Sequence, residues 1–224
     1  MAAALKNYYS FAQYSRGEDL LSCTFHALGI LLSIAGTVLL IVFSALYSNA
    51  WAIVSSSIFG ASMITLYSAS TLYHFSTSEN AKKYLKKFDH IAIYYLIAGT
   101  YTPFMLVNVR GVTGWTIFGI VWALAILGTV LKLKTKGSGT KAWSISLYMG
   151  MGWLSIFALK SMWETMPVTG FTFLVLGGVL YSLGVIFYVW KSKKYTHAIW
   201  HLFVLAGTIM HFFAVLYGSV LPPQ

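Results

Sequence analysis

The sequence predicts an all-α integral membrane protein, a bundle of seven transmembrane helices. Hydrophobic residues make up 58% of the 224 residues. Charged residues make up only 9%, against roughly 25% in a typical soluble domain. Seven apolar stretches are each long enough for a membrane-spanning helix, which needs about 20 residues. A soluble fold of this size would not cover so much apolar surface with so few charges.

The composition also excludes other classes of protein. Seven spans leave no room for a separate soluble domain, so we expect one membrane domain over residues 1–224. Cys23 has no second cysteine to pair with, which excludes a disulfide scaffold. The aliphatic and aromatic content excludes disorder. A net charge of +10 would suggest nucleic acid in a soluble protein, but nearly all of these cations lie before or between the apolar stretches. We expect contacts with anionic lipid headgroups there, and no nucleic-acid partner.

The spans follow one another with short, mostly polar spacers. The polar tail of residues 1–17 lacks the apolar core and cleavage site of a signal peptide, so we expect the first span to be an uncleaved anchor. Each span is expected to be helical because a helix pairs every backbone N–H and C=O internally in lipid. The predicted spans cover approximately residues 20–47, 51–75, 88–107, 112–131, 142–161, 168–190 and 197–221.

The distribution of lysine and arginine predicts the direction of each span. If the spans alternate in direction, thirteen of the fifteen cations lie on one side and only Arg110 and Lys160 on the other. Positive residues stay in the cytoplasm, so we expect the N-terminus in the cytoplasm and the C-terminus outside. The thirteen are Lys6, Arg16, Lys82, Lys83, Lys86, Lys87, Lys132, Lys134, Lys136, Lys141, Lys191, Lys193 and Lys194.

This topology brings polar residues of three spans to one depth. The second span ends at the cytoplasmic side near His74, the third begins there near Asp89, and the seventh begins there near His197 and His201. Ionisable residues inside a span are costly, so each is a candidate for function. Three helices therefore deliver polar side chains to the cytoplasmic end of the bundle.

The spacing of these residues points to a metal site. His197 and His201 are four residues apart, on one helix face about 6 Å apart along the axis. A third imidazole from His74 would complete a three-histidine zinc site, which leaves a fourth position for water, as in catalytic zinc centres. Asp89 could act as base toward that water or orient a ligand histidine. Ser70, four residues before His74, could hold Asp89, the water or a substrate carbonyl.

Simpler interpretations remain open for these residues. A pair of histidines four apart is a weak signal, and Asp89 beside four lysines could be an interface charge. His90 lies about 100° around the helix from Asp89 and is interpreted as interfacial or as a support for the site. Glu18 and His26 could face the site or cap and anchor the first span. Cys23 is expected to be a small packing residue, with a thiolate ligand as the alternative. His211, deeper in the membrane, is expected to be packed and hydrogen-bonded.

Four runs of sequence resemble a known family. They are GEDLLSCTFHALG at residues 17–29, SASTLYH at 68–74, LKKFDHIAIYYLIAGTYTPF at 85–104 and HAIWHLFVLAGTIMHF at 197–212. In this order they resemble the hemolysin III group, the bacterial branch of the progestin and adipoQ receptor (PAQR) family, within the CREST superfamily that includes alkaline ceramidases. The resemblance implies Zn²⁺ held by His74, His197 and His201, with Asp89 near its water and Ser70 close by.

The resemblance also implies a location and three possible functions. It suggests a multi-pass protein of a bacterial plasma (inner) membrane. The first function is a ceramidase-like hydrolase that cleaves a lipid amide or ester from the inner leaflet. The second is a receptor-like sensor in membrane homeostasis, with zinc as a structural ion. The third is the cytolysin, or hemolysin, of the group's name.

Overall fold

The computed structural model describes residues 14–135, 142–190 and 192–221, and these residues form helices without any strand. Seven of the helical segments are long and apolar enough to cross a membrane, which confirms the predicted fold class. The α-helices are α2 (Arg16–Tyr47), α3 (Ala50–Phe75), α4 (Glu79–Pro103), α5 (Val112–Lys134), α6 (Ala142–Trp153), α7 (Leu159–Thr165), α8 (Val168–Val189) and α9 (Thr196–Val215). Three short irregular helices continue α4, α6 and α9: η1 (Phe104–Asn108), η2 (Leu154–Ala158) and η3 (Leu216–Val220).

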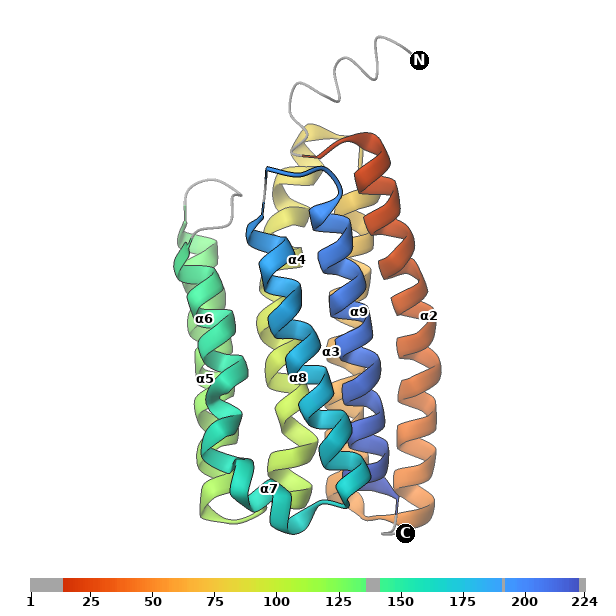
Figure 1. Ribbon diagram of the computed structural model, residues 1–224, viewed down its shortest axis with the longest axis vertical. Coiled ribbons are helices and arrows are strands. Elements are labelled where there is room, and N and C mark those ends of the chain that lie inside the picture. Colours follow the sequence, from red (N-terminus) through yellow and green to blue (C-terminus); the bar gives the residue numbers. More distant parts are fainter. Residues whose placement is uncertain (1–13, 136–141, 191, 222–224) are drawn as a thin grey trace.

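The helices run side by side along one long axis, with α9 packed against α2 and α8 (Figure 1). One end of the bundle holds the starts of α2, α4, α6 and α9. All the lysines that the structure describes, except Lys160, lie there, so we call it the lysine end. It is defined by Lys82, Lys83, Lys86, Lys87, Lys132, Lys134, Lys193 and Lys194; Lys6, Lys136, Lys141 and Lys191 lie outside the described residues. Arg110 and Lys160 lie toward the opposite end.

Helix α4 begins earlier than the third predicted span, which was expected to start at residue 88. The Ser78 side chain accepts a hydrogen bond from the Ala81 N–H, and Glu79 forms an exposed ion pair with Lys83 at 2.8 Å. The Ser78 cap and this ion pair stabilise a first stretch of helix that contains several lysines and is too polar to lie in lipid. Lys82 is buried and paired with Asp19, so it is not a simple charge facing water. The helix boundary is set by capping, whereas hydropathy marks only the part that suits lipid.

The buried face of α2 is a stripe of mostly polar and small residues at spacings of three and four. In a helix this spacing keeps residues on one side. Gly29 permits a close approach, because a Cβ there would lie 2.5 Å from the ring of Tyr67 on α3. The stripe consists of Asp19, Ser22, His26, Gly29, Ser33, Gly36, Leu40 and Ser44.

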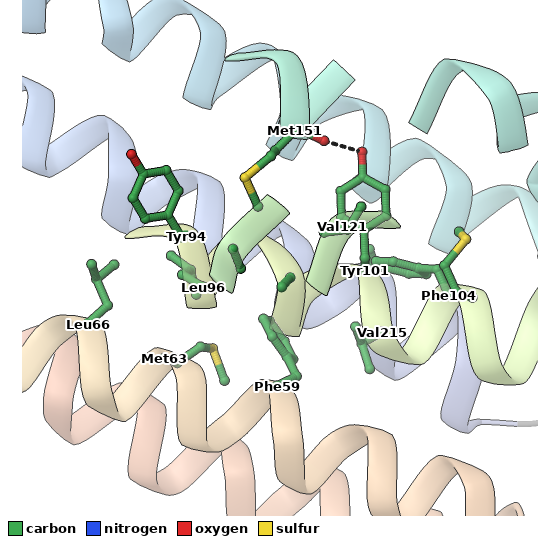
Figure 2. Close-up of a cluster of buried hydrophobic side chains, with 14 of the residues drawn as sticks. Phe59, Met63, Leu66, Tyr94, Leu96, Tyr101, Phe104, Val121, Met151 and Val215 are labelled. Atoms are coloured by element: carbon green, nitrogen blue, oxygen red, sulfur yellow. Dashed lines mark hydrogen bonds between the residues drawn. The ribbon is translucent and has the colours of Figure 1, made fainter. Parts of the chain in front are cut away.

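A tyrosine supports the break in the fifth span, where α6 passes into η2. The Tyr101 hydroxyl on α4 lies 2.8 Å from the Met151 carbonyl and 2.7 Å from the Gly152 carbonyl, to either of which it can donate (Figure 2). Carbonyls at such a break lose regular helical partners, and in lipid no water replaces them. Figure 2 also shows the apolar cluster around this contact, with Phe59 and Met63 of α3 beneath it.

At the opposite end from the lysines, a side-chain bridge joins η1 and η3. The Asn108 amide donates to the Gly218 carbonyl at 2.6 Å, and the Ser219 hydroxyl donates to Asn108 Oδ1 at 2.5 Å. Both segments are π-helical. The bridge therefore fixes the ends of α4 and α9 relative to each other, far from the histidines that these helices approach at the lysine end.

Candidate metal centre

Three buried histidines meet at the lysine end of the bundle. His74 is the next-to-last residue of α3, and His197 and His201 lie in the first two turns of α9. Their Nε2 atoms form a triangle, with His201 3.0 Å from both His74 and His197, and His74 3.4 Å from His197. Among the described residues, this trio is the group that could hold a metal ion.

An acidic residue of α2 holds the far side of the His74 ring. Asp19 Oδ1 lies 2.6 Å from His74 Nδ1, and its other oxygen lies 2.5 Å from Lys82 Nζ. Asp19 and His74 are both fully buried. An ionised carboxylate only accepts hydrogen bonds, so Nδ1 of His74 carries the proton and Nε2 presents its lone pair to the other two histidines.

A second residue of α2 contacts His201. Nε2 of His26 lies 2.7 Å from Nδ1 of His201, and the two rings meet edge to face. His26 Nδ1 has no hydrogen-bond partner among the described residues. When His201 donates through Nδ1 to His26, Nε2 of His201 is likewise a bare lone pair. The stripe on α2 thus reaches two members of the trio.

Tyr14, just before α2, covers His197. The two rings are stacked with centroids 4.1 Å apart and planes inclined by 10°. The Tyr14 hydroxyl is 3.2 Å from His197 Nδ1, but in a stacked pair it lies over the imidazole plane, where neither the N–H nor the lone pair points. We therefore treat the contact as stacking. Burial raises the pKa of Tyr14 well above that of a free phenol, with smaller contributions from Tyr188, Glu18 and Asp89, so the ring stays neutral.

The geometry of the trio fits a tetrahedral metal ion. A metal held by nitrogens at about 2.0–2.1 Å in tetrahedral geometry places those nitrogens about 3.3 Å apart. The observed separations are 3.0, 3.0 and 3.4 Å. Converging lone pairs repel one another, and a proton on one nitrogen can satisfy only one of its two neighbours. A cation would satisfy all three, and imidazole nitrogen suits zinc, copper, iron and nickel.

Asp89 and Ser70 lie together beside this trio. Ser70 is one turn before His74 on α3, and its hydroxyl approaches the Asp89 carboxylate of α4. The approach falls short of a regular hydrogen bond, since Ser70 Oγ has no such partner among the described residues. Lys86 and the buried Lys132 attract the same carboxylate. Asp89, 3% exposed, is thus an acid in a cationic environment, and the serine it approaches lies one turn before His74 on α3.

The remaining sequence candidates lie around the trio and not within it. Glu18 is buried, and its carboxylate lies against the backbone N–H groups of Tyr195 and His197 at the start of α9. There it complements the positive end of the helix. His90 is buried and interacts electrostatically with His197. Cys23 is half-buried, outside the trio.

His211 lies about 15 Å farther along α9 than His201, at 1.5 Å per residue. It packs against α8, where its Nε2 donates to the Leu174 carbonyl at 3.2 Å. A Cβ on Gly177 would lie 2.2 Å from the His211 ring. The residue is far from the trio along the helix.

Asp19, Lys82 and Tyr14 were missed by the sequence reasoning. The signal for Asp19 lies in the spacing of α2, because Asp19, Ser22 and His26 follow one another at intervals of three and four. That pattern includes Asp19 in the buried stripe. In the sequence, Lys82 does not differ from the other lysines of its spacer, and no pattern marks Tyr14 as a site residue.

The chain is similar to proteins of known name over most of its length. A family model described as "Haemolysin-III related" matches residues 14–212. The chain is 47% identical over 206 residues to "Hemolysin-3 homolog" of Bacillus subtilis (strain 168), covering 92% of this chain and 96% of that protein. It is 44% identical over 205 residues to "Hemolysin-3" of Bacillus cereus, covering 92% and 93%. It is 28% identical over 208 residues to human "Monocyte to macrophage differentiation factor", covering 88% and 83%.

Proposed function

The chain belongs to the haemolysin-III-related family of multi-pass membrane proteins, and from this premise we propose that it is a zinc-dependent hydrolase of lipid amides or esters. The observation that carries the proposal is the convergence of three histidine Nε2 atoms beside a buried acid, Asp89. A three-histidine site leaves one coordination position for water, which is typical of catalytic zinc. When bound, Zn²⁺ would lower the pKa of a water and polarise a substrate carbonyl.

The protein's own residues would supply the remaining chemistry. Asp89 would accept the proton from the attacking water and return it to the leaving amine or alcohol. The nearby Ser70 hydroxyl would orient Asp89 or hydrogen-bond to the substrate carbonyl. Asp19 and His26 would keep the His74 and His201 rings turned toward the centre of the trio.

The position of the lysines supports an orientation of the protein in the membrane and a class of substrate. Positive residues favour the cytoplasmic side, so this end would face the cytoplasm and the C-terminus would lie outside. In a bacterium the membrane would be the inner one. Exposed residues such as Lys83 and Lys194 would contact anionic headgroups. A trio at this depth favours a carbonyl of a lipid in the inner leaflet over a peptide.

Turnover by purified protein in liposomes tests the proposal. Ceramide and phospholipid would be supplied as substrates with Zn²⁺ present, and release of fatty acid would be measured. We expect Asp89→Asn to lower the rate by about 10² or more, as for loss of a general base. Glu79→Gln is the matched control, because Glu79 is an acid on the same helix, exposed and paired with Lys83; its rate should equal that of the wild type. Equal rates for wild type and Asp89→Asn, or no release by either, would overturn the proposal.

A sensor with a structural metal is the second candidate, favoured by how the trio joins helices. His74 belongs to α3, while His197 and His201 belong to α9, and both helices are contacted by α2 through Asp19 and His26. A metal would tie these helices together, and lipid binding would change their packing. Metal removal that lowers the melting temperature, in a protein that hydrolyses none of the lipids tested, would favour this candidate.

The names of two relatives bring in a third candidate, cytolysis. Seven membrane-spanning helices favour a protein that stays in its own membrane, so lysis by cells that produce it would be indirect. Lysis of erythrocytes by purified, detergent-free protein would support the cytolysin instead.

A further inference from the structure

An apolar crevice opens between α2 and α9, with α3 as its floor. Its volume is about 220 Å³. Leu32 and Leu39 at its edge are each nearly half exposed, on the outer surface of a helix that can span the membrane. Met63 and Tyr67, which also line it, are 2% and 0% exposed. The crevice therefore runs from the lipid-facing surface to residues of the buried core.

Small residues of the α2 stripe create this space. Gly29, Ser33 and Gly36 follow one another on the face of α2 that meets α3 and α9. A Cβ on Gly36 would lie 3.1 Å from the ring of Phe212, so a larger side chain there would crowd Phe212 and narrow the crevice that both residues line. Pockets for drug-sized ligands measure about 300–1,000 Å³. The smaller volume here suits part of one narrow, flexible chain.

The crevice lies along the bundle in line with the histidine trio. Its lining on α9 runs from Leu205 to Phe213, about 6 to 18 Å beyond His201 at 1.5 Å per residue. It starts one turn past the trio and extends toward the middle of the bundle. A lipid with its headgroup at the lysine end would have its tail in this direction and its acyl linkage near the level of the trio.

We propose that this crevice binds one acyl chain of a membrane lipid, with the headgroup toward the lysine end. The occupant follows from the surroundings, because acyl chains are the medium around the middle of a spanning helix and the lining is almost wholly apolar. The orientation rests on the proposed function, in which the lysine end faces the cytoplasm and the substrate is a lipid of that leaflet.

An acyl chain in the crevice would contact Tyr67, which packs against His26 behind the trio. The Tyr67 ring meets the His26 ring edge to face at 5.0 Å, and its hydroxyl donates to Thr208 Oγ1 at 2.7 Å. His26 in turn lies 2.7 Å from His201. Tyr67 is thus the wall between the crevice and the trio, and an acyl chain against it would hold His26 in place behind His201.

Photocrosslinking in liposomes tests the inference without using turnover. The full chain would be reconstituted with phosphatidylglycerol that carries a diazirine either near the carbonyl or halfway along one acyl chain. Crosslinked residues would be mapped by mass spectrometry. Because Met63 and Tyr67 are buried, bulk lipid does not reach them. We expect the label near the carbonyl to mark Tyr67 and the deeper label to mark Met63, about 6 Å farther along α3.

Two variants and a control complete the experiment. Gly36→Leu and Ser33→Leu fill the crevice and should each lower crosslinking at Met63 severalfold. Gly119→Leu makes the same change where a Cβ would meet nothing within 4 Å, and should leave it unchanged. Metal content measured on every sample would exclude a folding defect as the cause of a loss.

The outcomes distinguish a failure of the acyl-chain site from a failure of the proposed hydrolase activity. Crosslinks at Met63 and Tyr67 in a protein without turnover would support the binding site and reject the hydrolase. Turnover without crosslinks at either residue, or crosslinks that Gly36→Leu and Ser33→Leu leave unchanged, would overturn the binding site. Labels in the reverse order would overturn the orientation. Loss of lipid crosslinks together with protein dimers would identify a second copy as the occupant.

Discussion

Asp19 on α2 and His74 on α3 form a buried contact of 2.6 Å between Oδ1 and Nδ1, and Lys82 on α4 completes it at 2.5 Å from the other carboxylate oxygen. Three helices therefore fix the orientation of one imidazole. A carboxylate behind a metal-binding histidine fixes its tautomer and makes it a better ligand. Removal of the Asp19 carboxylate would be costly, because the buried Lys82 and the buried His74 would each lose a charged partner.

Asp19→Asn should weaken metal binding by about 10- to 100-fold, the usual effect of losing such a supporting carboxylate. The amide keeps a similar shape but not the negative charge. Competition with a chelator of known affinity measures the change. Glu79→Gln, an exposed acid-to-amide change, is the control and should bind metal as the wild type does. Unchanged affinity in Asp19→Asn would show that this contact serves only packing.

Removing a histidine of the trio should abolish stoichiometric metal binding. His74→Ala and His201→Ala each leave two nitrogens, so we expect elemental mass spectrometry to find stoichiometric zinc in the purified wild type and none in either variant. His211→Ala is the matched control, a buried histidine of α9 bonded to Leu174. Zinc retained in both trio variants would contradict the ligand assignment.

Metal should also stabilise the folded protein. A ligand at about 1,000 times its Kd adds about 4 kcal/mol of stability. We therefore expect Zn²⁺ to raise the melting temperature of the wild type and of His211→Ala, but not that of His201→Ala. An equal rise in all three would mean that the metal binds elsewhere.

The stacking of Tyr14 on His197 predicts different results for two substitutions. Tyr14→Phe keeps the stacked ring and loses only a hydroxyl that lies over the imidazole, so metal release should be as slow as in the wild type. Tyr14→Ala uncovers His197, and chelator should then remove the metal faster. The rate of metal loss to excess chelator distinguishes the two. Fast loss in Tyr14→Phe would show that the hydroxyl itself matters.

The Asn108 bridge should contribute to stability and not to metal binding. Asn108→Leu removes both bonds between η1 and η3 and leaves the Gly218 carbonyl without that donor, which should cost about 1–3 kcal/mol. Thermal unfolding in detergent measures the loss. Thr172→Ala, which removes an exposed hydroxyl that bonds to the Val168 carbonyl within α8, is the control. A shift no larger than that of Thr172→Ala would contradict the role given to the bridge.

Hydropathy was sufficient to predict the fold, since each spanning helix must be long and apolar. Because successive spans alternate in direction, the sequence also predicts that His74, His197 and His201 lie at one depth. In the structure their Nε2 atoms lie within 3.4 Å of one another. From the sequence, Glu18 and not Asp19 is named as the acid that could face the site, although neighbours on a helix point about 100° apart and it is Asp19 that contacts His74. Only the spacing of the whole α2 stripe assigns Asp19 to that face.

Other features depend on tertiary contacts that no local pattern carries. The sequence places Lys82 and Lys132 in polar spacers, yet both are buried: Lys82 pairs with Asp19, and Lys132 lies near Asp89. The α4 boundary moved from residue 88 to Glu79 because Ser78 caps the helix. The change from α6 to η2 meets a Tyr101 hydroxyl some 50 residues away in sequence.

The bridge between η1 and η3 has a mechanical consequence for the trio. It joins the ends of α4 and α9 that lie opposite the lysine end. The separation of these two helices can therefore change least at the bridge and most at the lysine end. From Leu216 to His201 the lever is about 22 Å long, and a tilt of about 5° at the clamp would shift His201 sideways by about 2 Å. Such a displacement exceeds what metal coordination tolerates. Small rotations of α9 about its anchored base would therefore move His197 and His201 toward or away from His74 in the candidate metal centre, without any helix having to unfold.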